Sequence, residues 1–299
     1  MTSLRKAWEV LWPEIHIKEE IGKGGFGIVY SAHWRDMMVA VKTVNGHFSV
    51  SDVNAEFDKE IATLQLVRHP NIVLFFGAGT TEDGTPFLVT ELVELGDLRN
   101  YLATHAIGWD RKLQFALDTA EGMAHLHSLG KIHRDLKSGN LLVSASLRVK
   151  VADFGTAAFA SHAWVTDVIN TPAPIPQAYE NWSLSPATSM KHTKGVGTPL
   201  WMAPELLEGR SSYGQRVDVY SFGIVMWEIA SQAAPWSHIK FGAFVMSQLV
   251  KLVNSGQRPP TDPSWPLPYR RLMSSCWATE PEDRLPFDRI RTAIKFMIK

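Results

Sequence analysis

Short apolar segments separated by turn residues make up most of the first 90 residues of the chain. These segments are rich in β-branched and aromatic residues and are broken by glycines or by Arg35-Asp36, a pattern typical of strands. Strands are predicted at residues 15–17, 28–30, 39–41, around 72–76 and around 87–90. Residues 51–68 begin with a serine and end before His69-Pro70, which indicates a helix between the third and fourth strands.

Helical periodicity replaces this pattern from about residue 95 onward. Leu113, Leu117, Ala120 and Ala124 fall on one face of a long predicted helix. Residues 215–230 are apolar nearly all round, which is typical of a fully buried central helix. The predicted fold class is therefore α+β, with a small sheet and one helix first and a larger, mainly helical part after them.

Composition narrows the classes of function. Hydrophobic residues make up 45% of the 299 positions, and 30 Lys and Arg balance 30 Asp and Glu. Zero net charge argues against a nucleic-acid partner bound through a broad basic face. A single cysteine, Cys276, cannot form an intramolecular disulfide, which suits a reducing compartment. Neither a signal peptide nor a membrane span is expected, since the most apolar run covers only residues 219–227, so a cytoplasmic location is predicted.

A glycine-rich segment, Gly22–Val29, has the spacing GxGxxGxV. In a dinucleotide-binding turn a helix follows the glycines directly, whereas the residues here, 28–34, are strand-like. The segment is therefore predicted to be a turn between two antiparallel strands, with glycines that let backbone N–H groups approach a phosphate closely. A plain hairpin with surplus glycine is the alternative interpretation.

Lys42 ends the predicted strand 39–41, where a lysine is ordinarily a solvated edge charge. In the predicted helix that follows, Glu60 falls within the apolar face, close to Val53 and Leu64 in angle. A carboxylate on that face is costly without a partner, and Lys42 is the candidate. Glu56 is a less central alternative to Glu60. Such a pair would present the lysine ammonium to the phosphates of a nucleotide.

Three further motifs follow in a fixed order along the chain. Residues 132–140 read Ile-His-Arg-Asp-Leu-Lys-Ser-Gly-Asn, Asp153 begins Asp-Phe-Gly, and Glu205 ends Ala-Pro-Glu. With the glycine-rich segment and Lys42 before them, the sequence resembles a eukaryotic protein kinase over about residues 15–298. The resemblance implies a bilobal protein-kinase-like fold, with an antiparallel-sheet N lobe over about 15–91 and a mainly helical C lobe over about 94–298. Residues 1–14 would be an N-terminal extension, and residues 153–205 a long activation segment.

The resemblance also implies a role for each residue of these motifs in phosphoryl transfer from ATP. Asp135 would accept or orient the proton of the acceptor hydroxyl, and Lys137 would neutralise the γ-phosphate. Asn140 and Asp153 would supply oxygen ligands to Mg²⁺, with Mn²⁺ as an alternative ion. The Lys42–Glu60 pair would hold the nucleotide phosphates. Thr198 would keep Asp135 and Lys137 in position.

The remaining ATP contacts follow from the same resemblance. The contacts from the glycine-rich segment would be Gly22, Lys23, Gly24, Gly25, Phe26 and Gly27. The walls around adenine would be Ile21, Val29, Ala40 and Leu142, and the gatekeeper would be Thr90. The hinge backbone would be that of Glu91 and Val93, the ribose contact Asp97 and the metal ligand Asp153.

Several other polar residues are expected to be structural. By the resemblance, His133 would pack beneath the Asp-Phe-Gly turn, Asp218 would cap the backbone of the His-Arg-Asp loop, and Glu205 would form a buried ion pair with Arg284. His125 and nearby His127 lack cysteine or carboxylate neighbours with metal-ligand spacing, so no zinc site is expected there.

The motifs around Asn140 and Glu205 are similar to those of the tyrosine-kinase-like group, which includes Raf and the mixed-lineage kinases. This similarity favours a serine/threonine kinase acting on a protein substrate, and leaves dual specificity open. A pseudokinase scaffold, held inactive by the long activation segment, is the rival class. Thr198 and the Ala-Pro-Glu segment argue against a small-molecule kinase. The oligomeric state is not predicted.

The activation segment is the one departure from the family pattern, because Glu205 follows Asp153 by 52 positions. Within it, residues 161–190 contain four prolines, many Ser and Thr and almost no charge, which predicts a long mobile loop. We expect regulatory phosphorylation there, by an upstream kinase or by autophosphorylation, with the phosphate paired to Arg134. The first-choice site is Thr193, with Thr188 and Ser189 as alternatives. An unregulated surface insertion is the competing interpretation.

Overall fold

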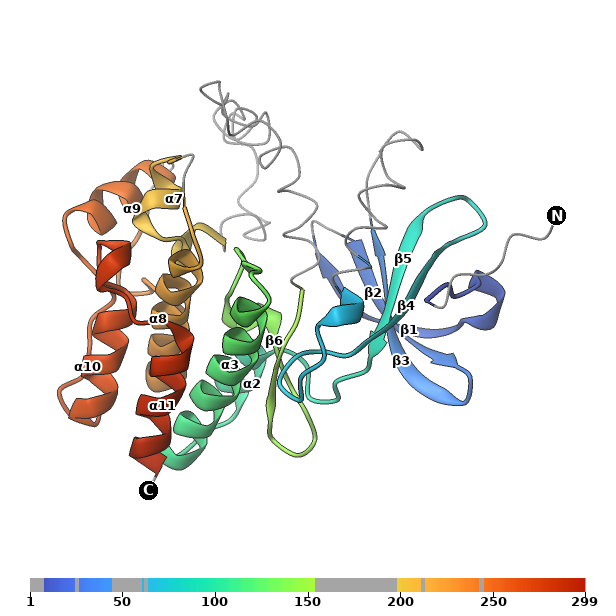
Figure 1. Ribbon diagram of the computed structural model, residues 1–299, viewed down its shortest axis with the longest axis horizontal. Helices are drawn as coiled ribbons and strands as arrows, with labels where there is room; N and C mark the ends of the chain where they lie inside the picture. Colours follow the sequence, from blue (N-terminus) through green and yellow to red (C-terminus); the bar gives the residue numbers. More distant parts are fainter. Residues whose placement is uncertain are drawn as a thin grey trace.

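The structure is a computed structural model that describes residues 8–24, 27–44, 61, 64–153, 198–210, 213–241 and 245–298. Within this part of the chain, strands β1–β5 form one half of the molecule and the larger helices form the other (Figure 1). This arrangement confirms the predicted fold class. Among the described helices, none combines the length and hydropathy needed to cross a membrane.

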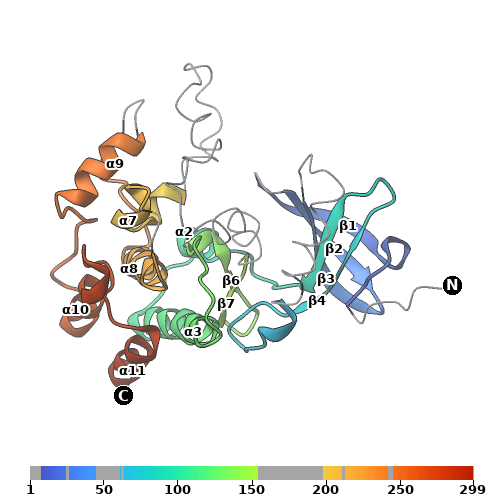
Figure 2. The same cartoon turned by 45° about the horizontal axis from the view of Figure 1, so that its top comes forward.

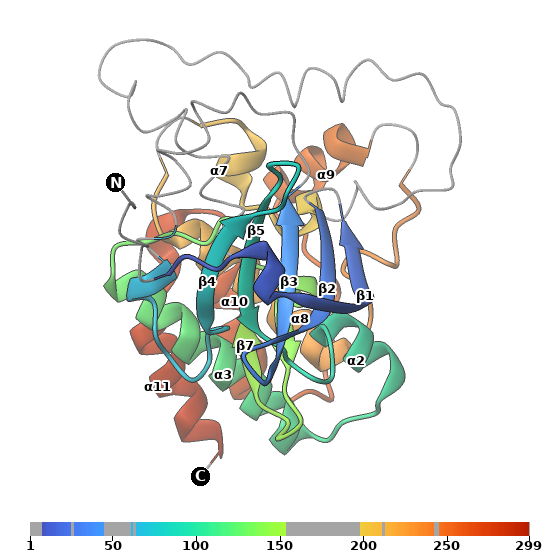
Figure 3. The same cartoon turned by 90° about the vertical axis from the view of Figure 1, so that its right-hand side faces the viewer.

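The first half is a five-stranded antiparallel sheet with the order β1-β2-β3-β5-β4 (Figure 3). Its strands are β1 (His16–Gly24), β2 (Gly27–Trp34), β3 (Met37–Val44), β4 (Phe75–Thr80) and β5 (Pro86–Glu91). The predicted turn between β2 and β3 is formed by Arg35 and Asp36, which both have positive φ. Two consecutive residues in that region suit a two-residue hairpin whose twist matches the strands.

The strand predicted around residues 72–76 is wrong in its position. β4 begins only at Phe75, and Ile72 instead forms an isolated bridge with Val151. Val73 donates to the Val151 carbonyl at 2.9 Å, so these apolar residues find backbone partners outside the sheet. In the predicted helix 51–68, the described residues Ile61 and 64–66 are helical. The helix therefore ends at residue 66, earlier than expected.

Alternation along β3 assigns each side chain to a face of the sheet. Val39 and Val41 are fully buried in the core, so Ala40 and Lys42 lie on the opposite face. Lys42 is the cross-strand partner of Val29 on β2 and of Leu88 on β5. Since direct cross-strand partners share a face, β3 presents Lys42 beside Val29, the last residue of the glycine-rich segment.

The second half consists mainly of helices packed around one buried member. They are α2 (Leu98–Thr104), α3 (Trp109–Ser128), α7 (Pro204–Leu207), α8 (Arg216–Ser231), α9 (Val245–Asn254), α10 (Leu267–Cys276) and α11 (Phe287–Ile298). Every residue of α8 from Val217 to Ala230 is buried, which confirms the predicted central helix. It packs against α3 and α10 (Figure 2).

A short hairpin connects the helical half to the motifs that carry chemistry. Its strands are β6 (Leu141–Val143) and β7 (Val149–Val151), and the 3-10 helix η2 (Ser138–Asn140) comes directly before it. A second 3-10 helix, η4 (Thr198–Trp201), lies against α8. Two carboxylates, Asp218 and Glu228, lie inside the buried stretch of α8. A buried carboxylate must find hydrogen-bond partners. Glu228 finds them on η2 and η4, and Asp218 finds them on His133 and Arg134, which precede η2.

Candidate active site

The segment His133–Asn140, called the catalytic loop below, brings three of the predicted site residues into direct contact. The Asp135 carboxylate accepts from Lys137 Nζ at 2.6 Å and from Asn140 Nδ2 at 2.9 Å. Asn140 Nδ2 also donates to the Asp135 carbonyl at 2.8 Å. These bonds hold one carboxylate, one ammonium and one amide within a few ångströms of each other.

Asp153 joins this group from the end of β7. Lys42 forms an ion pair with the Asp153 carboxylate, and Ala152 N–H donates to the Asn140 carbonyl at 2.8 Å. The five residues Lys42, Asp135, Lys137, Asn140 and Asp153 are thus linked by a continuous set of contacts. They come from β3, the catalytic loop and the residue pair after β7.

Asp218 on α8 anchors the start of the catalytic loop. Its buried carboxylate accepts from the backbone N–H groups of His133 and Arg134, each at 2.8 Å. His127 Nε2 lies 2.8 Å from the same carboxylate. The predicted capping of the loop by Asp218 is confirmed. Arg134 has a φ of 69°, a strained value for a non-glycine residue, and these bonds hold it there.

His133 links the loop to the residue before Asp153. Its side chain is fully buried, and Nε2 lies 3.0 Å from the Ala152 carbonyl. This contact confirms the expected structural position of His133 under the start of the Asp-Phe-Gly turn. Because Asp153 itself has a φ of 64°, the contact also constrains a second residue held in the left-handed region.

Glu228, nearly three turns after Asp218 on α8, anchors the other end of the catalytic loop. Its carboxylate accepts from Ser138 Oγ at 2.5 Å and from Trp201 Nε1 at 2.7 Å. Complete burial raises the pKa of Glu228 to about 7, against the opposing effect of these hydrogen bonds. Glu228 was not among the residues predicted from the sequence. The signal that could have found it is a carboxylate inside a helix that is otherwise apolar all round.

Glu205 and Arg284 form the buried ion pair that the resemblance implied. Arg284 donates from both terminal nitrogens to the Glu205 carboxylate, at 2.6 and 2.9 Å. The guanidinium also donates to the carbonyls of Ala278, Thr279 and Arg216. Both side chains are buried, so this pair fastens the end of the Ala-Pro-Glu motif to the segment before α11.

Several residues predicted to contact the adenine and the phosphates lie on one face of the sheet. Val29 is the cross-strand partner of both Gly22 and Lys42, and Ala40 is the partner of Thr90. Since such partners share a face, the structure brings these five residues together. Ile21 and Lys23, on the neighbouring stretch of β1, are largely exposed, whereas Gly24 and Gly27 pair with each other.

The predicted hinge and ribose residues lie where β5 passes into α2. Asp97 caps α2, accepting from Asn100 N–H at 2.8 Å, and forms a bridge with Leu142. The Glu91 carboxylate accepts from Lys150 Nζ and from Leu74 N–H, both at 2.7 Å. Its side chain is therefore already engaged, and its backbone N–H donates to the Leu74 carbonyl at 2.9 Å, so its backbone carbonyl is the part that stays predicted to meet adenine.

The buried Val93 completes the described residues near the hinge. Other predicted residues lie outside the described part of the chain: Gly25, Phe26, Glu60 and Glu56, the side chain of Thr198, and Thr188, Ser189 and Thr193 within segment 154–197. The Lys42–Glu60 pair therefore stays a prediction. Within the described part of the chain, Lys42 is paired with Asp153.

The side-chain oxygens of Asn140 and Asp153 are suitable ligands for a magnesium ion. Asn140 commits its amide nitrogen to Asp135, which turns its amide oxygen away from that carboxylate. One carboxylate and one amide oxygen are the hard ligands that Mg²⁺ takes from a protein when phosphates and waters complete its shell. Among the described residues, no cluster of three or more His, Cys, Asp or Glu could hold a metal without such help.

Comparisons with known proteins agree with this geometry. A family model described as the protein kinase domain matches residues 15–294. The probable serine/threonine-protein kinase drkD of Dictyostelium discoideum is 38% identical over 296 residues, covering 97% of this chain and 20% of that protein. The serine/threonine-protein kinase CTR1 of Arabidopsis thaliana is 34% identical over 298 residues, covering 97% of this chain and 32% of that protein.

A third relative is named for a broader specificity. The dual specificity protein kinase shkD of Dictyostelium discoideum is 36% identical over 290 residues, covering 94% of this chain and 34% of that protein. This chain thus spans between 20% and 34% of the length of these three relatives. Of these relatives, drkD and CTR1 fall in the tyrosine-kinase-like group that the motifs around Asn140 and Glu205 predicted.

Proposed function

This chain belongs to the protein kinase domain family, and from that membership we propose that it transfers the γ-phosphate of ATP to a serine or threonine hydroxyl of a protein substrate. The observation that carries the proposal is the linked group of Lys42, Asp135, Lys137, Asn140 and Asp153. This group brings together the Asp135 carboxylate, two ammonium groups and the side-chain oxygens of Asn140 and Asp153, which supports the proposal because phosphoryl transfer requires a base, positive charge and metal ligands.

Asp135 is the proposed base. Its carboxylate is held by Lys137 and Asn140, so it presents a fixed acceptor for the proton of a substrate hydroxyl. Lys137 lies beside that carboxylate and would offset the charge that develops on the transferred phosphoryl group. Asp218 and Glu228 anchor the loop, and this anchoring would keep the side chains of Asp135 and Lys137 in place while the substrate reacts.

Lys42 is the proposed contact to the nucleotide phosphates, and Asn140 and Asp153 are the proposed metal ligands. A magnesium ion held there would neutralise and orient the phosphate oxygens. Lys42 reaches Asp153 from β3, so the sheet side and the helical side of the molecule would meet at the phosphates. The same site would accept Mn²⁺, which shares the preference for oxygen ligands.

The adenosine part of ATP is proposed to lie along the sheet face that carries Val29, Ala40 and Thr90. Asp97, fixed by its capping bond to Asn100, would accept from a ribose hydroxyl. The proposed kinase domain extends over residues 15–298, with lobes at about 15–91 and 94–298.

Arg134 supports regulation by a phosphate on the segment 154–197. Its Nε is buried and has no hydrogen-bond partner among the described residues, and its guanidinium lies 5.5 Å from the centre of the Tyr213 ring. A phosphate would give this guanidinium a charge-assisted partner. Phosphosite mapping of an active preparation is expected to find modification at Thr193, or at Thr188 or Ser189. An active preparation with no phosphate in this segment would contradict this regulation.

The proposed activity is tested by phosphate transfer from labelled ATP with Mg²⁺, onto the protein and onto a generic substrate protein. Lys42→Met and Asp135→Asn serve as inactive controls. Acid hydrolysis of the product should release phosphoserine or phosphothreonine, and both substitutions should abolish the label. Phosphotyrosine in addition would show the dual specificity for which the relative shkD is named. Nucleotide-dependent thermal stabilisation without any transfer would favour the pseudokinase scaffold.

A further inference from the structure

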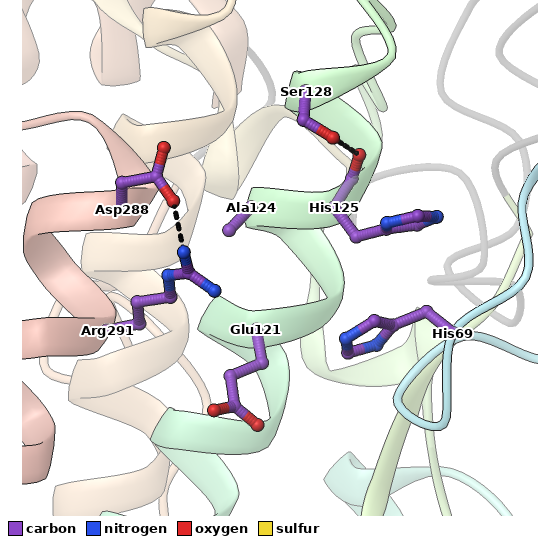
Figure 4. A pocket seen from close by; sticks show the side chains of 7 residues that line it. All are labelled: His69, Glu121, Ala124, His125, Ser128, Asp288 and Arg291. Carbon is purple, nitrogen blue, oxygen red and sulfur yellow. Dashed lines mark hydrogen bonds and ion pairs between the residues drawn. The ribbon is translucent and has the colours of Figure 1, made fainter.

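A cavity of about 150 Å³ lies away from the proposed active site, between α3, α11 and the segment before β4 (Figure 4). Its lining is polar and rich in titratable groups: His69, Glu121, Ala124, His125, Ser128, Asp288 and Arg291. The rings of His69 and His125 stack across it, with centroids 5.2 Å apart and planes 23° apart. Two stacked imidazoles are compatible with one another only while at least one of them is uncharged.

His69 is bonded in a way that requires its neutral form. Its Nδ1 accepts from the backbone N–H of Asn71 at 3.1 Å. An imidazole nitrogen accepts a hydrogen bond only when it carries no proton, whereas both nitrogens carry protons in the imidazolium ion. Protonation of His69 therefore replaces this hydrogen bond with two donors facing each other.

The groups around the cavity give little compensation for a new positive charge. Asp288 is paired with Arg291 at 2.8 Å, and Glu121 with Lys295 of α11 at 2.7 Å. Burial lowers the pKa of His69 below its ordinary value of 6.5, with smaller lowering effects from His125 and Arg291 and an opposing effect from Glu121. On the side of α3, His125 Nε2 is buried without a hydrogen-bond partner among the described residues.

Asn71 connects this histidine to the strand that leads to Asp153. The Asn71 carbonyl accepts from Val151 N–H, and Asn71 Nδ2 donates to the Val149 carbonyl, both at 2.9 Å. Val73 N–H donates to Val151 in turn. The segment after His69 is thus bonded to both ends of β7, and Asp153 follows β7 by two residues.

We propose that His69, stacked on His125, is a proton-responsive contact that controls how firmly β7, and with it Asp153, is held. At neutral pH the His69–Asn71 bond is intact and β7 is fixed along residues 71–73. In acid the imidazolium loses that bond and repels Arg291, so the segment moves away and β7 loosens. Phosphotransfer therefore declines on acidification through a group that touches neither ATP nor the substrate.

The substitution His69→Asn removes the titratable group and keeps a hydrogen-bond acceptor for Asn71 N–H. An asparagine Oδ1 occupies nearly the place of Nδ1 and still accepts from Asn71 N–H, but it does not titrate. His238→Asn, at an exposed position outside the cavity lining, is the matched control. His125→Phe keeps an aromatic ring against His69 and removes the second imidazole.

The first measurement is the titration of ¹³C-labelled histidines by NMR, with amide hydrogen exchange at Val149 and Val151 corrected for intrinsic rates. His69 is expected to titrate below 6.5, and its midpoint to rise in His125→Phe. Loss of one hydrogen bond should lower protection of the two amides by about fivefold as His69 becomes protonated. This change should occur in the wild type and in His238→Asn, and be absent in His69→Asn.

The second measurement is the pH profile of phosphotransfer. Of the two measurements, only this one rests on the proposed function. The acidic fall in rate should begin at lower pH in His69→Asn than in the wild type. Titration of His69 at or above 6.5, or exchange profiles that are the same in His69→Asn and the wild type, would overturn the proposal. A protein without transferase activity but with the expected titration and exchange would contradict only the proposed function.

Discussion

The indole N–H of Trp201 donates to the carboxylate of Glu228 at 2.7 Å inside the protein. The same carboxylate accepts from Ser138 of the catalytic loop. One buried side chain on α8 therefore joins the loop that carries Asp135 to the short helix that begins at Thr198. The two segments lie far apart in sequence, and this carboxylate makes them depend on each other.

Glu228→Gln is expected to stabilise the protein at alkaline pH relative to the wild type. Because the pKa of Glu228 is raised from 4.5 to about 7, the folded protein binds this proton more tightly than the unfolded chain. Its favourable contribution is full below pH 4.5 and is lost as the pH rises to about 7. Glutamine imitates the protonated carboxyl, so its advantage should grow by about 1–3 kcal/mol over this range. Urea unfolding at several pH values measures it.

Glu228→Ala is the control for that experiment. It leaves Ser138 and the indole N–H of Trp201 without their buried acceptor, so it should destabilise the protein at every pH. If the difference in unfolding free energy between the glutamine variant and the wild type did not change with pH, the shifted titration of Glu228 would be contradicted.

Asp218→Ala should lower kcat by more than about tenfold, with a smaller change in KM for ATP. The substitution removes the acceptor for two backbone N–H groups, that of His133, which is buried, and that of Arg134, which is partly buried. Each unsatisfied donor costs about 1–3 kcal/mol, and Arg134 is then free to leave its strained φ. Steady-state kinetics and thermal unfolding measure the two effects. Asp218→Asn, which keeps one acceptor oxygen, should fall between the wild type and alanine; a variant with unchanged kcat would refute the positioning role.

Breaking the Glu205–Arg284 pair from one side should destabilise the protein by about 3–5 kcal/mol. Glu205→Ala leaves a guanidinium in the interior, and Arg284→Met leaves a carboxylate there. The double variant leaves neither charge, so it should be less destabilised than the sum of the single variants. Denaturant unfolding of all four proteins gives the coupling free energy. If the changes in unfolding free energy of the two single variants simply added up in the double variant, the two side chains would not interact energetically.

Gly122→Ala should be destabilising although it lies inside α3, where alanine is intrinsically the better helix former by about 1 kcal/mol. A Cβ on Gly122 would lie 2.5 Å from the Asn71 carbonyl oxygen and 3.0 Å from Val151. The helix and the segment after His69 would have to separate, at a cost of about 1–3 kcal/mol. Thermal unfolding checks this, with Gly214→Ala as the control, since a Cβ there meets nothing within 4 Å. Equal melting temperatures for the two variants would contradict the close approach.

The sheet and the central helix could be predicted because their patterns are local. Alternation places Val39 and Val41 on one face, and the two-residue turn at Arg35-Asp36 fixes the β2–β3 register. The roles of Asp218 and of the Glu205–Arg284 pair were predictable only through the resemblance, since no local pattern names a partner 79 positions away.

The features that were missed depend on tertiary partners. Ile72 and Val73 have the composition of a strand, but Ile72 forms a bridge with Val151 in the other half of the molecule, and Val73 N–H donates to the Val151 carbonyl. Composition cannot say which edge a segment joins, so the predicted strand began too early. The pairing of His69 with His125 was likewise not visible in the sequence, because their stacking depends on how α3 packs against the segment before β4.

The spacing of two carboxylates along α8 matches the spacing of the catalytic-loop residues that they bind. Asp218 and Glu228 are ten positions apart, which corresponds to about 15 Å along a helix axis. The loop is fastened at Arg134 by the first and at Ser138 by the second. Inserting a single residue between the two carboxylates would advance Glu228 by about 1.5 Å and rotate it by about 100°, carrying it off the loop. The middle of α8 should therefore accept many exchanges of one apolar residue for another, and no insertion or deletion at all.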